Sequence, residues 1–394
     1  MIIWRDSYFI SIIKSDTVFL IFTVLILLCL LTLGYAVALV WILLGLYRIP
    51  KEKSDLQPHV SVVVAARNES ENIKALLTAL TAQDYPRDKY EIIVVDDDSE
   101  DDTSALVEKA ATATERPLIR LLHTTNRDQV ISPKKNALDL GISQSTGEIL
   151  LFTDADCAPP ARWISGMVSR FTPSVGMVIG YSSYELPQLR GITSYLLALD
   201  SLSLAAVAAG TSGWGRPATC TGRNLAYRKK VYREVGGFEE IKNFISGDDD
   251  LFLQLVLKKT NWNVRYALDP ELVVPTKILN SFKRFYHQRL RHASKGLHYD
   301  RNKIAALVGI YLFNLLLFIL IPLTLLVHHL PEIPLLCFGL KTILEFHLLS
   351  QFAIRMRRLN LLVVFPLAAL FHVPYVIVFG AMGQYAKFNW KGQQ

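Results

Sequence analysis

The chain has 394 residues, of which 51% are hydrophobic and 20% are charged, and its formal net charge is +7 at pH 7. This basic excess is modest for the length, and no basic stripe with interleaved aromatic residues occurs, which argues against nucleic acid as a partner. The Cys and His residues have no metal-ligand spacing, so a zinc site is not indicated either.

The first predicted element is an apolar, uncharged run from Val18 to Tyr47. It exceeds the about 20 residues that cross a bilayer and has no small-residue cleavage site, which favours a membrane anchor over a signal peptide. Further apolar runs occupy 305–327, 333–354 and 361–382, of which the middle one is interrupted by Lys341, Glu345 and His347. We therefore expect an N-terminal region at 1–50 with an anchor at about 18–47, a soluble domain at 51–303, and a membrane region at 304–394 with about three transmembrane helices.

Basic residues flank the apolar runs, and this asymmetry predicts the orientation of the chain. Arg48, Lys51 and Lys53 follow the first run, and Arg355, Arg357 and Arg358 precede the last. The turn at 328–334 has no Lys or Arg. By the positive-inside rule, we expect a multi-pass protein of the cell membrane with its soluble domain in the cytoplasm, and anionic membrane lipids as partners of the basic clusters.

Strand and helix patterns alternate through the first half of the soluble part. Strands are predicted at 59–66, 90–96, 118–123 and 148–153, and helices at 71–83, 103–113 and 134–145. Strands that are separated by helices join through right-handed crossovers, so the sequence predicts an α/β fold with a Rossmann-like, mostly parallel sheet.

A pair of carboxylates, Asp154 and Asp156, closes the last of these strands. If the chain stays extended there, side chains two residues apart point the same way, at the carboxyl edge where open α/β sheets bind ligands. Two neighbouring carboxylates repel each other unless a cation lies between them, and oxygen ligands suit a hard divalent ion that also holds a diphosphate. The clusters Arg67–Glu69 and Asp96–Ser99 follow two other strands, so we expect them at the same edge.

Taken together, these motifs resemble the family 2 nucleotide-sugar glycosyltransferases of the GT-A fold. The matching stretches, in the order of that family, are Val60–Glu69, Ile92–Ser99 with Asp101 and Thr103, Lys134–Leu138, Phe152–Asp156, Gly222–Arg228 with Gly236–Phe238, Gly247–Leu251, and Gln288–Arg291. They cover nearly all of the soluble part, so the resemblance implies a GT-A domain there.

The resemblance also implies a role for each matching residue. The donor-binding positions are Arg67, Asn68, Glu69, Asp97, Lys134 and Asp154; the metal ligands for Mg²⁺ or Mn²⁺ are Asp156 and Asp154; the acceptor and diphosphate positions are Gln288, Arg291 and His292. Asp248 matches the catalytic base. Because Gly247 replaces the acid that often precedes this base, Asp249 is a rival for the same role.

Some positions depart from the family pattern. Asp98 replaces a glycine of the acidic turn, and an aspartate tolerates the left-handed backbone better than most residues. His292 replaces the tryptophan that supports the acceptor in processive synthases. The apolar run Gly191–Gly210 is long enough to span a membrane, but a crossing there would put Asp156 and Asp248 on opposite sides. We expect it to be a packed or membrane-facing helix.

The sequence therefore predicts a membrane-anchored, inverting glycosyltransferase. Its donor would be a nucleotide-diphosphate sugar, and its acceptor a lipid-linked molecule or a glycan. Three alternatives stay open: a processive polysaccharide synthase, an enzyme that transfers a sugar directly to a polyprenyl phosphate, and an inactive relative that acts as a membrane scaffold.

Overall fold

The computed structural model describes residues 3–125, 130–185, 190–278, 282–294, 299–327 and 331–385. The chain divides into two compact units. The sheet unit comprises Ile42–Phe285 and Leu349–Phe365, and the helical unit comprises Met1–Trp41, Tyr286–Leu348 and Pro366–Gln394. The ends of the long helices thus belong to the sheet unit.

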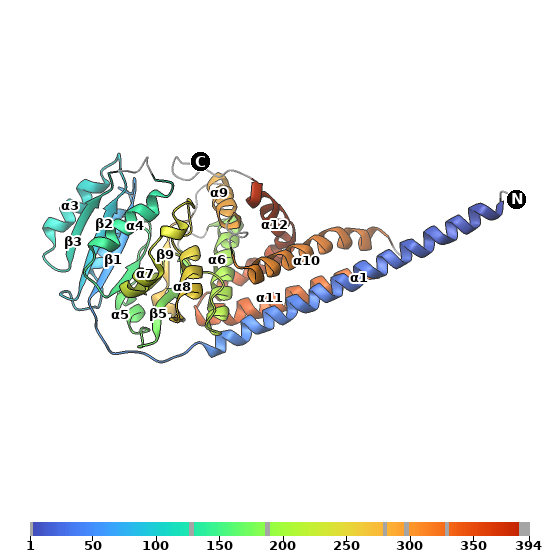
Figure 1. Cartoon of the computed structure of the whole chain (residues 1–394), viewed down its shortest axis with the longest axis horizontal. Coiled ribbons are helices and arrows are strands. Elements are labelled where there is room, and N and C mark those ends of the chain that lie inside the picture. The colour runs from blue at the N-terminus through green and yellow to red at the C-terminus, as the bar shows by residue number, and fades with distance from the viewer. Residues whose placement is uncertain are drawn as a thin grey trace. The chain divides into compact units, whose positions relative to one another are not determined.

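The sheet unit is built on a seven-stranded sheet with the order β3-β2-β1-β4-β7-β5-β8. Its edge with β3, β2 and β1 side by side can be followed in Figure 1. Its strands are β1 (Val60–Ala66), β2 (Tyr90–Asp96), β3 (Leu118–His123), β4 (Ile149–Phe152), β5 (Val175–Gly180), β7 (Leu225–Arg228) and β8 (Asn263–Ala267). Only β7 runs antiparallel to its neighbours, β4 and β5. A separate parallel pair joins β6 (Ser182–Tyr184) to β9 (Val274–Thr276). The predicted α/β fold with a mostly parallel sheet is confirmed.

Helices cover both faces of the sheet, because successive strand residues point to opposite sides. In β2, Ile92 and Val94 join the core beneath α2 (Ile73–Thr81), α3 (Thr103–Ala113) and α5 (Trp163–Val168). Ile93 and Val95 join a second cluster beneath α4 (Pro133–Gln144). The described part of the unit also contains the helices α6 (Gly191–Ser212), α7 (Lys229–Val235), α8 (Asp250–Lys259), η3 (Glu239–Ile241), η4 (Pro270–Leu272) and η6 (Leu359–Val364).

The predicted strand bounds match the observed bounds closely where the strand is apolar and β-branched, as at β2. The strand before Asp154 is shorter than expected, because β4 ends at Phe152. The Cys157 amide donates to the Asp154 carbonyl at 3.1 Å, and Cys157 bridges to Thr276. The expectation that Asp154 and Asp156 continue an extended strand was therefore wrong, since the chain turns between them.

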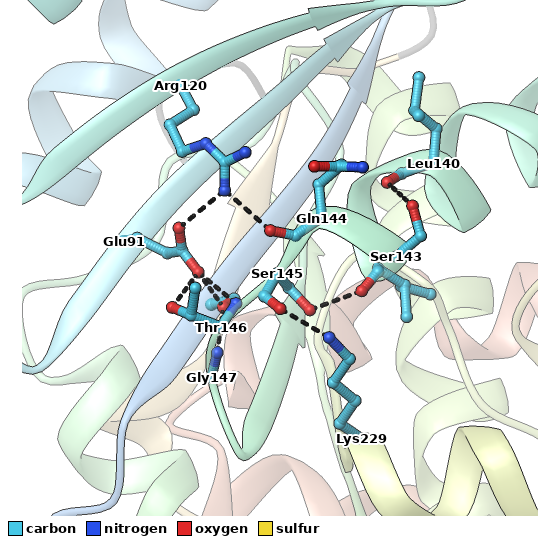
Figure 2. A network of polar contacts seen from close by, with 11 residues as sticks. Glu91, Arg120, Leu140, Ser143, Gln144, Ser145, Thr146, Gly147 and Lys229 are labelled. Atoms are coloured by element: carbon cyan, nitrogen blue, oxygen red, sulfur yellow. Dashed lines mark hydrogen bonds and ion pairs between the residues drawn. The ribbon is translucent and has the colours of Figure 1, made fainter.

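A buried carboxylate ties the amino edge of the sheet together (Figure 2). Glu91 of β2 accepts hydrogen bonds from the Ser61 hydroxyl at 2.6 Å and from both the amide and the hydroxyl of Thr146 at 2.7 Å. Arg120 lies 3.4 Å from its other oxygen and also donates to the Gln144 carbonyl. Burial alone would raise the pKa of Glu91, but these hydrogen bonds lower it overall.

We expect Glu91→Gln to destabilise the protein by about 1–3 kcal/mol at neutral pH, because an amide cannot accept this full set of bonds. The pKa of Glu91 is lower in the folded state, so its stabilisation is present above the unfolded pKa and is lost as the pH falls through the folded value. Thermal unfolding of the detergent-purified wild type and Glu91→Gln variant should show a difference in melting temperature at pH 7 that narrows in acid. A difference in melting temperature that stays constant down to pH 3 would contradict this expectation.

The helical unit contains α10 (Arg301–Leu326) and most of α1 (Ile3–Arg48), α9 (Phe282–Ala293), α11 (Ile333–Arg355) and α12 (Phe365–Tyr385). Leu28, Phe313, Leu317, Cys337 and Val373 form its core. By length and composition, α1, α6, α10, α11 and the Leu359–Gly383 stretch could cross a membrane. In α6, 44% of the most apolar window is buried, against 17% in α1, and α6 packs on β6 and β8. This burial supports the expectation that α6 is a packed helix.

The charges that interrupt the third apolar run are paired inside the helical unit. The Lys341 ammonium lies 2.8 Å from Glu345 and 3.0 Å from Nδ1 of His372, and the Tyr35 hydroxyl donates to Glu345. These side chains come from α1, α11 and α12. They explain how α11 continues as a helix through charged positions, since charges inside a membrane are tolerated when they pair.

Candidate active site

Lys134 lies at the centre of the site, at the beginning of α4. Its ammonium lies 2.8 Å from Oδ1 of Asp154 and 3.1 Å from Oδ2 of Asp248. Burial alone would lower the pKa of Lys134, but the two carboxylates raise it overall. Burial raises and Lys134 lowers the pKa of Asp154, with a net decrease. All three residues line one pocket, whose other lining residues are Ala65, Leu138, Phe152, Thr153, Gly222, Leu225 and Tyr227.

The two rival acids, Asp248 and Asp249, have different surroundings. Asp248 faces the pocket, where it pairs with Lys134. Asp249 is the N-cap of α8: its carboxylate accepts from the Asp250 amide at 2.6 Å and from the Gly222 amide at 3.0 Å. These contacts favour Asp248 as the residue that meets a substrate, and they give Asp249 a structural role.

Glycine at position 247 has a physical reason. Its φ is +102°, a left-handed backbone conformation, and a Cβ there would lie 2.6 Å from Cδ1 of Leu251. The acid that often stands here in the family would therefore strain the turn. Lys135, which is buried, holds the preceding segment by donating to the carbonyls of Phe244 and Ser246. The loop that carries Asp248 is thus fixed to the start of α4.

Asp156 lies half-buried beside Asp154, and the electrostatics show that the two carboxylates are close. Burial and then the charge of Asp154 raise the pKa of Asp156, while Arg223 lowers it and Glu69 raises it. Arg223 belongs to the loop before β7. Burial would lower its pKa, but Cys157, Tyr184, Asp154 and Asp156 raise it overall. A cation therefore lies near the paired acids.

Arg223 lies inside a matching stretch of the sequence, but the sequence pattern predicted no role for it. Its neighbour Asn224 is fully buried and structural: it accepts from the Trp163 indole at 2.9 Å and donates to the carbonyls of Tyr181 and Leu272. The only sign of Arg223 in the sequence is its charge beside Asn224. Its partners come from distant loops, which local sequence does not reveal.

The loops after β1 and β2 meet, as expected from their strand ends. The Asn68 amide donates to the Ser99 hydroxyl at 3.0 Å, and the Glu100 amide donates to the Asn68 side chain at 2.8 Å. The Glu69 amide donates to the Thr103 hydroxyl at 2.8 Å. Asn68 and Asp98 both have a positive φ, of 52° and 60°, so Asp98 does adopt the left-handed backbone.

The other predicted donor residues border the same edge. Arg67 pairs with Glu100 at 3.3 Å, and the Thr124 hydroxyl donates to the buried Asp97 carboxylate at 3.0 Å. Glu69 acts electrostatically on Asp156, which places this loop near the paired acids. The loops after β1 and β2 are therefore joined to each other, and Glu69 links them to the paired acids, while the donor and metal roles of these residues stay predictions.

The residues present fit a divalent ion that shares its coordination with a ligand. Asp154 and Asp156 supply hard oxygen donors, and their mutual repulsion is the condition that a cation relieves. Within the described ranges, no group of three or more His, Cys, Asp and Glu residues could hold a metal. A metal here would therefore need further oxygens from a ligand such as a diphosphate.

The predicted acceptor residues lie on α9, in the helical unit. Gln288 is partly buried, and its Oε1 has no hydrogen-bond partner among the residues that the structure describes. The side chains of Arg291 and His292 lie outside the described part of the chain. Their predicted roles stay predictions.

Comparison with known proteins agrees with this geometry. The model of "Glycosyl transferase family 2" matches residues 61–236, and that of "Glycosyl transferase family group 2" matches residues 150–381. Glycosyltransferase AglE of Haloferax volcanii is 36% identical over 33% of this chain and 41% of its own length. The probable glycosyltransferase YdaM of Bacillus subtilis is 25% identical over 62% of this chain and 57% of its own length. A beta-monoglucosyldiacylglycerol synthase of Trichormus variabilis is 28% identical over 62% of this chain and 50% of its own length.

The chain thus spans about half the length of the curated relatives it matches. Among solved structures, the mannosyltransferase PcManGT from Pyrobaculum calidifontis, in complex with GDP-Man and Mn²⁺, matches with a TM-score of 0.53 and 21% identity. That match covers 92% of this chain and 98% of the neighbour, and it supports the fold.

The sheet order, the antiparallel β7 and the acidic carboxyl edge define a GT-A type of glycosyltransferase domain. The chain belongs to family 2 of the glycosyltransferases.

Proposed function

We propose that this protein transfers a sugar from a nucleotide-diphosphate donor to an acceptor at the membrane, with inversion at the anomeric carbon. One observation carries this proposal: Lys134 pairs with both Asp154 and Asp248 in a single pocket. The predicted donor side and the predicted base therefore face the same space, as a direct displacement requires.

The donor would lie along the carboxyl edge of the sheet. Asn68, Glu69 and Asp97, with Arg67 beside them, would hold the nucleoside. Asp156 and Asp154 would hold Mg²⁺ or Mn²⁺, which neutralises the leaving diphosphate when bound. The complex of the neighbour PcManGT with GDP-Man and Mn²⁺ supports this assignment. Arg223 would add a fixed positive charge at the same place.

Asp248 would act as the base. It accepts the proton of the acceptor hydroxyl while the hydroxyl oxygen attacks the anomeric carbon and the nucleoside diphosphate leaves. One base opposite one leaving group gives a single displacement and therefore inversion. Lys134 would hold the Asp248 side chain in place, because the ammonium lies 3.1 Å away.

The acceptor would be a lipid-linked molecule or a glycan, met at the membrane surface, with Gln288, Arg291 and His292 on the acceptor side. The name of the relative from Trichormus variabilis, a glycolipid synthase, supports a lipid acceptor. We propose the same domains as above, a GT-A domain at 51–303 between an anchor at 1–50 and a membrane region at 304–394, with the GT-A domain in the cytoplasm of a multi-pass protein.

A topology experiment tests this arrangement. A cysteine at Glu332 should react with an impermeant reagent in intact cells, and one at Arg357 should react only after the cells are opened, because Lys and Arg gather on the inner side. The natural cysteines would first be replaced by serine. Reaction of the Arg357 site in intact cells would contradict the proposed orientation.

Donor binding tests the function itself. Purified protein should be protected against thermal unfolding by one nucleotide sugar of a panel of UDP-, GDP- and dTDP-sugars, and only with Mg²⁺ or Mn²⁺ present. Protection that survives EDTA unchanged, or no protection by any member of the panel, would count against the proposal.

A further inference from the structure

A second polar cluster lies in the sheet unit, beside the candidate active site. The rings of Tyr181 and Tyr266 both pack on Phe352, a fully buried residue near the end of α11, and Arg358 follows six positions later in the chain. The Phe352 ring centroid lies 5.8 Å from that of Tyr181 and 6.2 Å from that of Tyr266. Both tyrosines are only 2% exposed.

Several polar atoms of this cluster lack a partner. The hydroxyls of Tyr181, Tyr266 and Ser182 and the Nε of Arg358 are buried, without a hydrogen bond to any residue in the described ranges. The Arg358 guanidinium contacts the Ser183 hydroxyl, which lies 3.5 Å from Nη2. Buried polar groups in folded proteins are almost always bonded, so such a group of unpaired donors indicates a ligand.

The cluster adjoins the paired acids through β6 and β9. Tyr184 of β6 lies opposite Thr276 in the ladder, and Thr276 bridges to Cys157, the neighbour of Asp156. On the other side, Asn224 donates to the Tyr181 carbonyl, which places Arg223 next to the cluster. Burial raises the pKa of Tyr181, whereas Arg358 and Arg223 lower it, so both cations act on this hydroxyl.

The segment that carries Arg358 has the character of a membrane interface. Ile354, Leu359 and Val363 are more than half exposed, beside basic residues of the same segment. The preceding helix, α11, ends at Arg355. In the turn that follows, Arg357 has a φ of +55°, and the Arg358 amide donates to the Ala353 carbonyl at 2.8 Å. This left-handed turn separates the two arginines: Arg357 is exposed, whereas Arg358 is partly buried at the cluster.

We propose that Arg358, Tyr181 and Tyr266, here called the arginine–tyrosine cluster, bind the phosphate group of a membrane-lipid acceptor. Guanidinium and hydroxyl groups donate to phosphate oxygens, and their hydrogen bonds are strong when one partner is charged. A phosphate here would fill the unmet bonds of the cluster while its lipid tail stays with the exposed apolar side chains. The bound phosphate acts as a handle, and a hydroxyl of the acceptor faces Asp248.

This inference rests on the proposed function, since the lipid would be the acceptor of that reaction. Binding can nevertheless be tested separately. The probe is farnesyl monophosphate added to detergent-purified full-length protein in phosphate-free buffer, with farnesol and inorganic phosphate as comparisons. We expect thermal protection by farnesyl monophosphate, weaker protection by inorganic phosphate at equal concentration, and none by farnesol. Equal protection by inorganic phosphate would assign the site to a soluble ligand, and protection by farnesol would assign it to the apolar tail.

Variants locate the site. Arg358→Gln should weaken farnesyl monophosphate binding by roughly tenfold or more, the size expected for a lost charge-assisted bond. Arg358→Lys should weaken it less. The matched control is Arg357→Gly, which removes a neighbouring charge at a left-handed position that suits glycine and should leave binding unchanged.

Nucleotide-sugar protection of each variant serves as the check on folding and on the proposed function. We expect Arg358→Gln to keep it. Undiminished farnesyl monophosphate binding by Arg358→Gln would overturn the inference, and so would an equal loss in Arg357→Gly. If the wild type binds farnesyl monophosphate through Arg358 but no nucleotide sugar, the proposed function fails while the phosphate site stands.

Discussion

Asp248→Asn should reduce sugar transfer to a hydroxyl acceptor by about 10²–10⁴-fold, the usual contribution of a positioned general base. Donor affinity should change little, because Lys134 still pairs with Asp154 at 2.8 Å. Single-turnover transfer of a radiolabelled sugar separates the chemical step from binding. A hydroxyl loses its proton as the bond forms, and asparagine cannot accept that proton.

The matched control is Asp249→Asn. Asparagine caps a helix as well as aspartate does, so its one side-chain oxygen can keep the bond from the Asp250 amide, while the bond from the Gly222 amide is lost. We expect Asp249→Asn to fold normally and to keep turnover within about tenfold of the wild type, as for a structural position. If Asp249→Asn abolishes transfer and Asp248→Asn does not, the two roles are exchanged.

Asp156→Asn should remove the metal-dependent part of donor affinity. The loss should be roughly tenfold or more, since a hydrogen bond or contact to a charged group contributes about 1.5–3 kcal/mol. Calorimetric titration of the donor with Mn²⁺ and with EDTA measures this part directly. In the wild type the two affinities should differ, and in the variant they should converge.

The melting temperature without metal distinguishes Asp156→Asn from a variant that has lost binding because it is destabilised. The pKa of Asp156 is raised in the folded state, so its ionised form costs stability at neutral pH. Without metal, the variant should therefore melt at the same temperature as the wild type or higher. Asp98→Asn, in a left-handed turn that asparagine tolerates, is the control and should keep Mn²⁺-dependent binding. Full Mn²⁺-dependent affinity in Asp156→Asn would contradict the proposed metal site.

The sequence predicted the fold well where local pattern and tertiary environment agree. β2 is apolar and β-branched, is buried along its whole length, and has the predicted bounds Tyr90–Asp96. The turn after Phe152 could not be predicted, because it depends on the pairing of Cys157 with Thr276, 119 positions away in the chain. Strand propensity alone continues the strand through Asp154.

The candidate site was predictable as a set of residues but not as a set of contacts. Spacing brought Asp154 and Asp156 to one sheet edge, whereas the choice between Asp248 and Asp249 depends on which of them caps α8. Arg223 was missed because its partners arise from distant loops. Arg358 was interpreted only as a lipid-attracting surface charge, since nothing local indicates that it turns toward Ser183 while Arg357 stays exposed.

Sugar transfer to a membrane lipid can be measured with purified protein. Purified protein in lipid nanodiscs would be given the nucleotide sugar that protects it best, labelled in the sugar, with Mn²⁺ and a membrane lipid extract from the native cells. We predict that the wild type transfers label into the organic-extractable product and releases nucleoside diphosphate in equal amount. In Asp248→Asn, both the labelled product and the released nucleoside diphosphate should fall together. Release of nucleoside diphosphate without labelled product, or equal labelling by Asp248→Asn and the wild type, would contradict the account.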